Sequence, residues 1–434
     1  MNTKTWLAAV GCACTLAASG MPTQTELEKA QGLVNELMRS DVANFNARKM
    51  SASDVATSAL KYAGEAQSEA ARFLLLKGAF FYRVRAEDYD GAMDVISKIR
   101  NDINDVPDAT LVNILSSAIR SIPRKRAGRL YDLQQRLQDR ALYCVIDLSA
   151  GPNARKYPVS YLAAEPKGGW TDEYKTTKLV LRRIEPGKFM GIYGKRDSYE
   201  VTDKHEVTLT KPFYCGVFEV TKKQWELVTG DTHPSSSAED DMRPVRYVSW
   251  NAIRGDSATY NWPSSVNVDP STFMGKIRAR TGLNFDLPTG AQWEYACRAG
   301  TTNDDNIEKH GPDPKRGYPM VVGSCRPNAW GLYDMHENVW EWCLDWRWDL
   351  NKWIDNLPSR VTDPVGPPSP GEFRLFRGGT HNNSVGCVPS FWWNGANPVW
   401  VKFAMGFRLF IHTDFPKERG IKPLPLPNKA AGRK

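Results

Sequence analysis

The chain has 434 residues, of which 41% are hydrophobic and 24% charged. This length exceeds what one ordinary core needs, and this composition excludes a disordered or fibrous protein. A mean hydropathy of −0.48, with no long apolar run after the N-terminus, excludes a polytopic membrane protein. The net charge of +8 comes from scattered basic residues, so we expect no nucleic-acid ligand.

Residues 1–20 have the layout of a secretory signal peptide. Lys4 precedes an apolar stretch from Trp6 to Leu16, and small residues follow it. We therefore expect export to the periplasm, the cell surface or the medium. A lipid on Cys12 or Cys14 would instead attach the protein to a membrane, but the apolar stretch before Cys12 is short for a lipoprotein signal.

Cleavage near residue 20 would leave six cysteines. An even number in an oxidising compartment is compatible with disulfides, whose pairing the sequence does not define. No two of the six have C-x-x-C spacing, which argues against a zinc ribbon or a thioredoxin-type site. The six are Cys144, Cys215, Cys297, Cys325, Cys343 and Cys387.

Residues 24–145 are predicted to form an all-α domain of helical hairpins. Apolar residues recur at helical spacing in three stripes, and Pro107 separates two of them. The region contains no histidine, so a histidine-ligated metal centre within it is excluded, and we expect a spacer or docking module. The stripes are Ala92, Val95, Ile96, Ile99 and Ile103; Leu111, Ile114, Leu115, Ala118, Ile119 and Ile122; and Leu130, Leu133, Leu137 and Ala141.

A linker is predicted over residues 146–174, which are rich in Gly, Pro and Lys. Residues 175–412 then change to short strands and short helices, with strands expected at 180–189 and 205–210. All tryptophans except Trp6 and Trp170 lie in this part, which predicts an α+β domain with much irregular structure and a Trp-rich core. The basic, Pro-rich tail 413–434 should be extended or disordered.

Three helices of this α+β domain have recognisable ends. Thr221 and Thr289 each begin a capping box that is completed by a glutamine three residues later. Gly230 is placed to end the first helix. Asp269 and the proline after it should open a third helix, which Gly282 can close.

Seven segments of this domain occur in an order that is specific to one family. The segments are FYCGVFEVT (213–221), RPVRYVSW (243–250), LPTGAQWEYA (287–296), NAWGLYDM (328–335), NVWEWC (338–343), RGG (377–379) and GFRL (406–409). With this series the domain resembles the sulfatase-modifying-factor domain, the fold of the formylglycine-generating enzyme, along residues 175–412. The resemblance implies a C-type-lectin-like α+β fold.

The resemblance also identifies where catalytic residues would lie. The enzyme of this family oxidises a sulfatase cysteine to formylglycine and binds copper(I) through two cysteine thiolates, which are soft ligands. The first of these positions falls on Asn383 and the second on or beside Cys387. Asparagine supplies no thiolate, so we expect no copper. Cys387, the only catalytic candidate, is interpreted as a structural thiol.

A structural calcium loop is a further implication of the resemblance. Asp334 and Glu341 would supply side-chain oxygens, and Glu337 and Val339 would supply backbone carbonyls, because calcium prefers oxygen ligands. Glu337 stands where the family has glycine. The alternative is a metal-free turn in which the two carboxylates cap or pair.

In the resembling enzyme the substrate lies beside the positions of Trp340, Thr380 and Asn383. His381 and Trp392 extend this set of candidate ligand-binding residues, and His381 has no evident acid–base partner in the sequence. Aromatic rings interleaved with amides suit a peptide, a protein or a glycan. We therefore expect non-catalytic recognition. The alternatives are a formylglycine-generating oxidoreductase and an inert domain whose helical half docks a partner.

Overall fold

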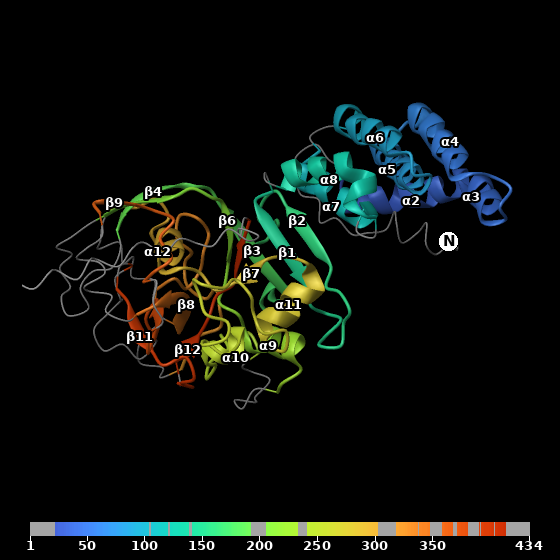
Figure 1. Cartoon of the computed structure of the whole chain (residues 1–434). Coiled ribbons are helices and arrows are strands. Elements are labelled where there is room, and N and C mark those ends of the chain that lie inside the picture. The colour runs from blue at the N-terminus through green and yellow to red at the C-terminus, as the bar shows by residue number, and fades with distance from the viewer. Residues whose placement is uncertain are drawn as a thin grey trace, which may run out of the picture. The chain divides into compact units, whose positions relative to one another are not determined.

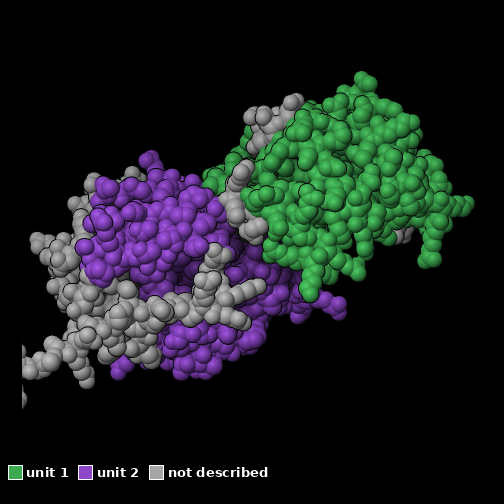
Figure 2. Space-filling model, turned by 45° about the horizontal axis from the view of Figure 1, so that its top comes forward, with its two compact units in different colours: residues 1–144, 160–170 green, residues 145–159, 171–434 purple. Residues whose placement is uncertain are grey.

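The computed structural model describes most of the chain between residues 22 and 413 (Figure 1). It divides into two compact units, coloured separately in Figure 2: unit 1 contains residues 1–144 and 160–170, and unit 2 contains residues 145–159 and 171–434. The predicted signal peptide and, apart from residue 413, the predicted tail lie outside the described residues. These are 22–103, 106–119, 122–138, 141–191, 205–232, 241–302, 318–336, 338–347, 358–367, 371–380, 390, 392–402 and 404–413.

Unit 1 contains the predicted helical hairpins, which confirms an all-α part ahead of the α+β part. Its helices follow one another through short connections (Figure 1). They are α2 (Gln24–Leu37), α3 (Arg39–Asn46), α4 (Ala52–Glu65), α5 (Glu69–Arg85), α6 (Tyr89–Asp102), α7 (Asp108–Ile119) and α8 (Arg124–Gln138).

The local sequence explains where these helices begin. Thr23 and Ser51 form capping boxes at the starts of α2 and α4, and Ser68 and Asp88 accept backbone hydrogen bonds at the starts of α5 and α6. Helix α5 is buried along most of its length, because it packs against α2, α4, α6 and α7. It is therefore the central helix of unit 1.

The stretch predicted as a linker contains regular structure instead. Strand β1 (Tyr143–Asp147) and strand β2 (Val159–Leu162) contain two of the three points at which the chain passes between the units. The third point follows Trp170, just before the 3₁₀ helix η1 (Asp172–Lys175). The run from Tyr143 to Ile146 is buried, as expected for a strand of Tyr, Cys, Val and Ile. The glycines and prolines that suggested a linker lie in the loops around these elements.

Unit 2 combines short helices with short strands, as predicted. Its helices are α9 (Lys222–Thr229), α10 (Trp250–Arg254), α11 (Phe273–Thr281) and α12 (Gly290–Arg298). Its further strands are β3 (Lys178–Ile184), β4 (Gly187–Gly191), β5 (His205–Leu209), β6 (Phe213–Gly216), β7 (Phe285–Asp286), β8 (Trp340–Trp346), β9 (Arg360–Thr362), β10 (Arg374–Arg377), β11 (Asn394–Ala396), β12 (Met405–Gly406) and β13 (Phe410–His412).

The strands form three small sheets. The first has the order β2-β1-β3-β6-β13-β7, so β13 lies between β6 and β7 and pairs antiparallel with both. The second has the order β11-β10-β8-β12, in which β12 runs parallel to β8. The third has the order β4-β5-β9. Strands distant in sequence are thus neighbours in every sheet.

The predicted helix ends are confirmed in α9 and α12 and corrected in α11. Thr221 and Thr289 make both hydrogen bonds of a capping box. Gly230 and Gly282 end α9 and α11 with φ of 85° and 74°, a region that favours glycine. Helix α11 begins after Thr272 rather than at Asp269, because residues 269–272 form a turn that the Asp269 side chain and carbonyl stabilise.

The core of unit 2 is rich in tryptophan, as predicted. Trp250, Trp293 and Trp342 are buried completely or almost so. Trp393 is buried while the neighbouring Trp392 is partly exposed, which matches the alternation of side chains in an extended chain. Among the helices that the structure describes, none is long and apolar enough to cross a membrane.

Candidate functional site

Three aromatic side chains gather on the second sheet and form what we call the aromatic cluster: Trp340, Phe376 and Trp392. The ring centroids of Trp340 and Trp392 are 5.0 Å apart, and those of Trp340 and Phe376 are 5.1 Å apart. Trp340 opens β8, Phe376 lies in β10, and Trp392 precedes β11. The two tryptophans are partly exposed and Phe376 is buried, so the cluster presents indole surface to a ligand over a packed base.

Two of the five predicted ligand-binding residues, Trp340 and Trp392, are therefore in contact. A third, Thr380, is 8% exposed and follows β10, so it adds little accessible surface in this arrangement. His381 and Asn383 lie outside the described residues.

The segment that carries Trp392 is fixed by a buried arginine. Arg377 Nη1 lies 3.1 Å from the carbonyl oxygen of Ser390 and 3.4 Å from that of Trp392. Its Nη2 donates to Glu294 Oε2 of α12 at 3.2 Å, and Arg298 donates to the other oxygen of Glu294. Arg377 thus connects the backbone at Ser390 and Trp392 to Glu294 of α12, which Arg298 also binds. We infer that Trp392 is held in place before any ligand binds.

In the predicted calcium loop, Glu341 and Val339 form hydrogen bonds with other protein groups. Glu341 is buried, and Arg408 Nη2 donates to its Oε1 at 2.8 Å while Trp293 Nε1 donates to its Oε2 at 2.7 Å. Val339 N donates to Glu219 Oε1 at 3.2 Å, and Glu337 lies outside the described residues. Glu341 would have to give up these partners to ligate a cation.

Asp334 has a left-handed backbone with φ of 55°, and its Oδ2 accepts a hydrogen bond from Gly323 N at 2.6 Å. Burial raises the pKa of Asp334 to about 6. Among the residues that the structure describes, no three His, Cys, Asp or Glu side chains are grouped so as to hold a metal ion. Calcium at this loop therefore stays a prediction.

A variant of Asp334 tests that prediction. If Asp334 ligates calcium, Asp334→Ala should lower the melting temperature by several degrees in calcium buffer and leave it almost unchanged in chelator, because a cation that binds the folded state stabilises it. Differential scanning fluorimetry in the two buffers gives both values. An equal shift in calcium and in chelator would show that Asp334 acts only through the hydrogen bond to Gly323.

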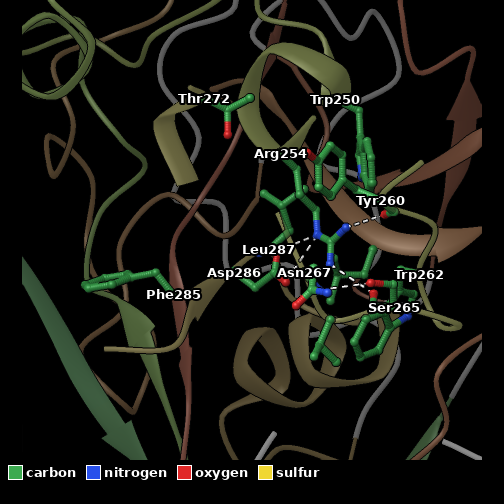
Figure 3. Close-up of polar contacts among 12 residues, drawn as sticks. Trp250, Arg254, Tyr260, Trp262, Ser265, Asn267, Thr272, Phe285, Asp286 and Leu287 are labelled. Carbon is green, nitrogen blue, oxygen red and sulfur yellow. Dashed lines mark hydrogen bonds and ion pairs between the residues drawn. The ribbon is translucent and has the colours of Figure 1, made fainter. Parts of the chain in front are cut away.

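A third buried arginine–carboxylate network joins three elements at Arg254 (Figure 3). Arg254 Nε donates to Asp286 Oδ1 at 2.9 Å, and its Nη1 lies 2.5 Å from the carbonyl oxygen of Tyr260. Arg278 Nη2 donates to Asp286 Oδ2 at 2.9 Å. Burial alone would raise the pKa of Asp286, but Arg254 and Arg278 outweigh it and hold that pKa below its ordinary value. Since Arg254 and Asp286 are completely buried, this network links α10, α11 and β7 structurally.

His412 lies beside this network and gives unit 2 a predicted pH dependence. Its Nε2 is 3.2 Å from the carbonyl oxygen of Leu287, and burial lowers the pKa of His412 to about 4, although the Asp286 carboxylate favours the protonated ring. The unfolded chain has the ordinary pKa of about 6.5 and binds more protons between pH 4 and 6.5. The stability that neutral His412 contributes should therefore be present above pH 6.5 and be lost as pH falls toward 4.

We expect the free energy of unfolding of wild type to fall by up to about 3 kcal/mol more than that of His412→Gln as the pH is lowered from 6.5 to 4. The size follows from a difference of roughly two units between the folded and unfolded pKa values of His412. Urea unfolding at a series of pH values measures this difference. Parallel pH profiles of the two proteins would contradict it.

Four of the described cysteines are buried thiols, namely Cys144, Cys215, Cys297 and Cys343, whereas Cys325 is partly exposed. Burial raises the pKa of Cys144 to about 12 and raises the pKa values of Cys215, Cys297 and Cys343 as well. Copper(I) needs thiolate ligands, so these four protonated thiols do not fit it. Cys387 lies outside the described residues.

Sequence reasoning missed one contact that involves a reactive side chain. His336 Nε2 lies 3.4 Å from Cys297 Sγ, although 39 positions separate the two residues. No short motif joins them, so no local pattern could have predicted the pair. The raised pKa of Cys297 means that the pair holds a thiol rather than an activated thiolate.

Unit 2 is thus an irregular α+β domain with an aromatic surface. It combines short strands, buried arginine–carboxylate pairs and a partly exposed tryptophan pair. Residues 171–413 match the model of the family described as sulfatase-modifying factor enzyme 1-like domain. The chain therefore belongs to this family, which confirms the resemblance and the fold class predicted from the sequence.

Several characterised proteins are similar to parts of the chain. The chaperone protein LppX of Paenibacillus barcinonensis is 31% identical over 210 residues, which are 39% of this chain and 71% of LppX. The formylglycine-generating enzymes of Bos taurus and Thermomonospora curvata are each 30% identical over 36% of this chain. The matches cover 46% and 50% of those enzymes, so the chain spans about half of their length.

Two solved structures are similar to the chain at lower sequence identity. Variable protein 1 of Treponema denticola has a TM-score of 0.41 and 23% identity, covering 54% of this chain and 96% of that protein. PvdO from Pseudomonas aeruginosa has the same TM-score and identity, covering 54% of this chain and 94% of PvdO.

Proposed function

We propose that unit 2 is a non-catalytic recognition domain that binds a peptide, a protein or a glycan at the aromatic cluster. The observation that carries this proposal is the contact between the tilted rings of Trp340 and Trp392. Both rings are partly exposed, and Arg377 hydrogen-bonds the Trp392 carbonyl. A pre-positioned indole pair offers a large contact area at low entropic cost. The similarity to LppX, a chaperone, favours a peptide or protein ligand.

The chemistry of the thiols supports the absence of catalysis. The sequence has asparagine at position 383, where the family's enzyme has its first copper-binding cysteine, and the four cysteines with raised pKa values are buried. A single thiol at Cys387 lacks the partner that copper(I) binding by a cysteine pair needs.

Alanine variants of the cluster test the proposal. The purified chain is first screened on peptide and glycan arrays, and the affinity for the strongest hit is then measured by calorimetry. Trp392→Ala and Trp340→Ala should each weaken binding by about tenfold or more, because each removes a partly exposed ring from the contact surface. Trp400→Ala is the matched control, since Trp400 is 44% exposed but lies outside the aromatic cluster. Equal losses for all three variants, or no loss for the cluster variants, would overturn the proposal.

Formylglycine generation is the second candidate function, favoured by the 30% identity to two formylglycine-generating enzymes. Its assay uses the chain loaded with copper(I), oxygen and a sulfatase-derived Cys-x-Pro-x-Arg peptide. We expect no aldehyde product in mass spectrometry. Aldehyde that disappears in a Cys387→Ser variant would replace the recognition proposal with an enzymatic one.

Export remains part of the proposal. If residues 1–20 form a signal peptide, the mature protein should begin near residue 21 and be recovered outside the cytoplasm. Mass spectrometry of the mature N-terminus decides this, and a lipid on Cys12 or Cys14 would identify membrane attachment instead.

A further inference from the structure

Unit 1 contains a hollow of about 570 Å³ between the end of α3, the start of α4 and the end of α5. Three cationic side chains line it, those of Arg48, Lys49 and Arg85, and Phe45 and Met50 add apolar surface. No acidic side chain is among the described residues that line it. This volume falls in the range of ligand-binding sites in proteins. We call it the basic hollow.

The backbone fixes where these cations lie. Arg48 follows the C-cap Ala47 of α3 and has a left-handed backbone with φ of 59°. Arg48 N donates to the carbonyl of Phe45 at 3.0 Å, and Lys49 N donates to that of Asn44 at 2.8 Å. The Arg85 guanidinium lies 5.0 Å from the centroid of the Phe45 ring. The side chains of Arg48, Lys49 and Arg85 therefore reach the same hollow from the ends of two helices.

The carboxylates near the three cations in sequence are already engaged. Glu87 pairs with Arg126 at 3.0 Å, and Asp88 pairs with Arg83 at 2.7 Å. Asp54 accepts hydrogen bonds from Ser51 N at 3.2 Å and from Ser51 Oγ at 2.6 Å, which closes the capping box of α4. Neither Arg48 nor Lys49 forms an ion pair with a described residue, and both are exposed. The start of α4 adds the partial positive charge of a helix N-terminus beside them.

Helix dipoles account for part of this arrangement, because cations near the ends of α3 and α5 are favourable there. They do not require the cations to converge on one hollow with an aromatic ring at its wall. We propose that the basic hollow binds an acidic peptide segment of a partner protein, with two or more carboxylates on the three cations and an apolar side chain on Phe45 and Met50. Arginine and lysine bind carboxylates through charge-assisted hydrogen bonds, which supplies both affinity and selectivity.

The test uses the full chain and a fluorescein-labelled octapeptide of alternating glutamate and leucine, followed by fluorescence anisotropy at low and at moderate salt. The hollow variant carries Arg48→Gln, Lys49→Gln and Arg85→Gln. It should weaken binding by about tenfold or more, and the same peptide with glutamine for glutamate should not bind wild type. Added salt should weaken the wild-type interaction.

A matched control removes the same charge elsewhere on unit 1, through Lys29→Gln, Lys61→Gln and Lys125→Gln, all at exposed positions outside the hollow. It should bind the acidic peptide within about twofold of wild type. Circular dichroism checks that both variants keep their helices.

Four results would overturn the proposal. Three concern the acidic peptide: no binding to wild type, unchanged binding by the hollow variant, or an equal loss of binding in the control. The fourth is binding of wild type, but not of the hollow variant, to anionic phosphatidylglycerol vesicles without binding to the peptide. The last result would identify a membrane surface as the occupant.

Discussion

Replacing Arg408 with methionine is expected to destabilise unit 2 by about 3–5 kcal/mol, the range for breaking a buried ion pair. Arg408 is completely buried, and both oxygens of Glu341 accept hydrogen bonds from it. Its Nη1 also donates to the carbonyls of Gly216 and Val217, at 2.9 and 3.1 Å. Methionine fills part of the volume but leaves the Glu341 carboxylate buried without a counter-charge, and it removes the arginine's hydrogen bonds to the carbonyls of Gly216, Val217 and Tyr333.

Urea unfolding followed by tryptophan fluorescence measures this change, because only Trp6 and Trp170 of the fifteen tryptophans belong to unit 1. The control is Arg360→Met, which removes an ion pair of unit 2 whose partners Arg360 and Glu206 are 82% and 31% exposed. That change should cost less than about 1 kcal/mol. The double variant Arg408→Met with Glu341→Gln should recover part of the loss, since the uncompensated charge is gone. A loss for Arg408→Met as small as the control would show that the pair contributes little.

Asp286→Asn is expected to destabilise unit 2 by a similar amount, about 3–5 kcal/mol. Asparagine keeps the shape of the side chain and one acceptor, so the change isolates the negative charge. Arg254, completely buried, and Arg278 would then face each other without the carboxylate between them. The packing of α10 and α11 against β7 should weaken with it, because the carboxylate joins these elements (Figure 3).

The same unfolding assay measures the effect, with Glu206→Gln as the more exposed counterpart in unit 2, where Glu206 pairs with Lys188. Asp286→Asn should shift the urea midpoint strongly and Glu206→Gln hardly at all. If Asp286→Asn proved as stable as wild type, the two arginines would have to be neutralised by other groups, and the network would not be a structural link.

Local sequence predicted the parts of the fold that depend on local hydrogen bonds. Thr221 and Thr289 were identifiable as helix caps because their partners lie three residues away. Helix α11 was placed too early, because Asp269 and Pro270 have the same signature as a helix start but form the turn before Thr272. The strands within residues 146–174 were missed because short strands between glycines and prolines have no distinct period.

The buried ion pairs could not be predicted, since arginine and glutamate usually mark exposed positions. Glu341 and Arg408 are 67 residues apart, and Arg254 and Asp286 are 32 apart. The contact of Trp340 with Trp392 was not predicted. The resemblance placed Trp340 beside the substrate, and Trp392 was a candidate only through the aromatic and amide-rich segment in which it lies. The basic hollow was not predicted, because Arg48 and Arg85 meet only through the packing of α3, α4 and α5.

The position of β13 has a consequence for how the protein is made. Residues 410–412 lie between β6 and β7, and Arg408 just before them completes the charge balance of Glu341. Unit 2 therefore cannot close its first sheet until residue 412 has left the ribosome. The helices of unit 1 form through contacts between neighbours in sequence, so they can assemble while most of unit 2 is still being translated.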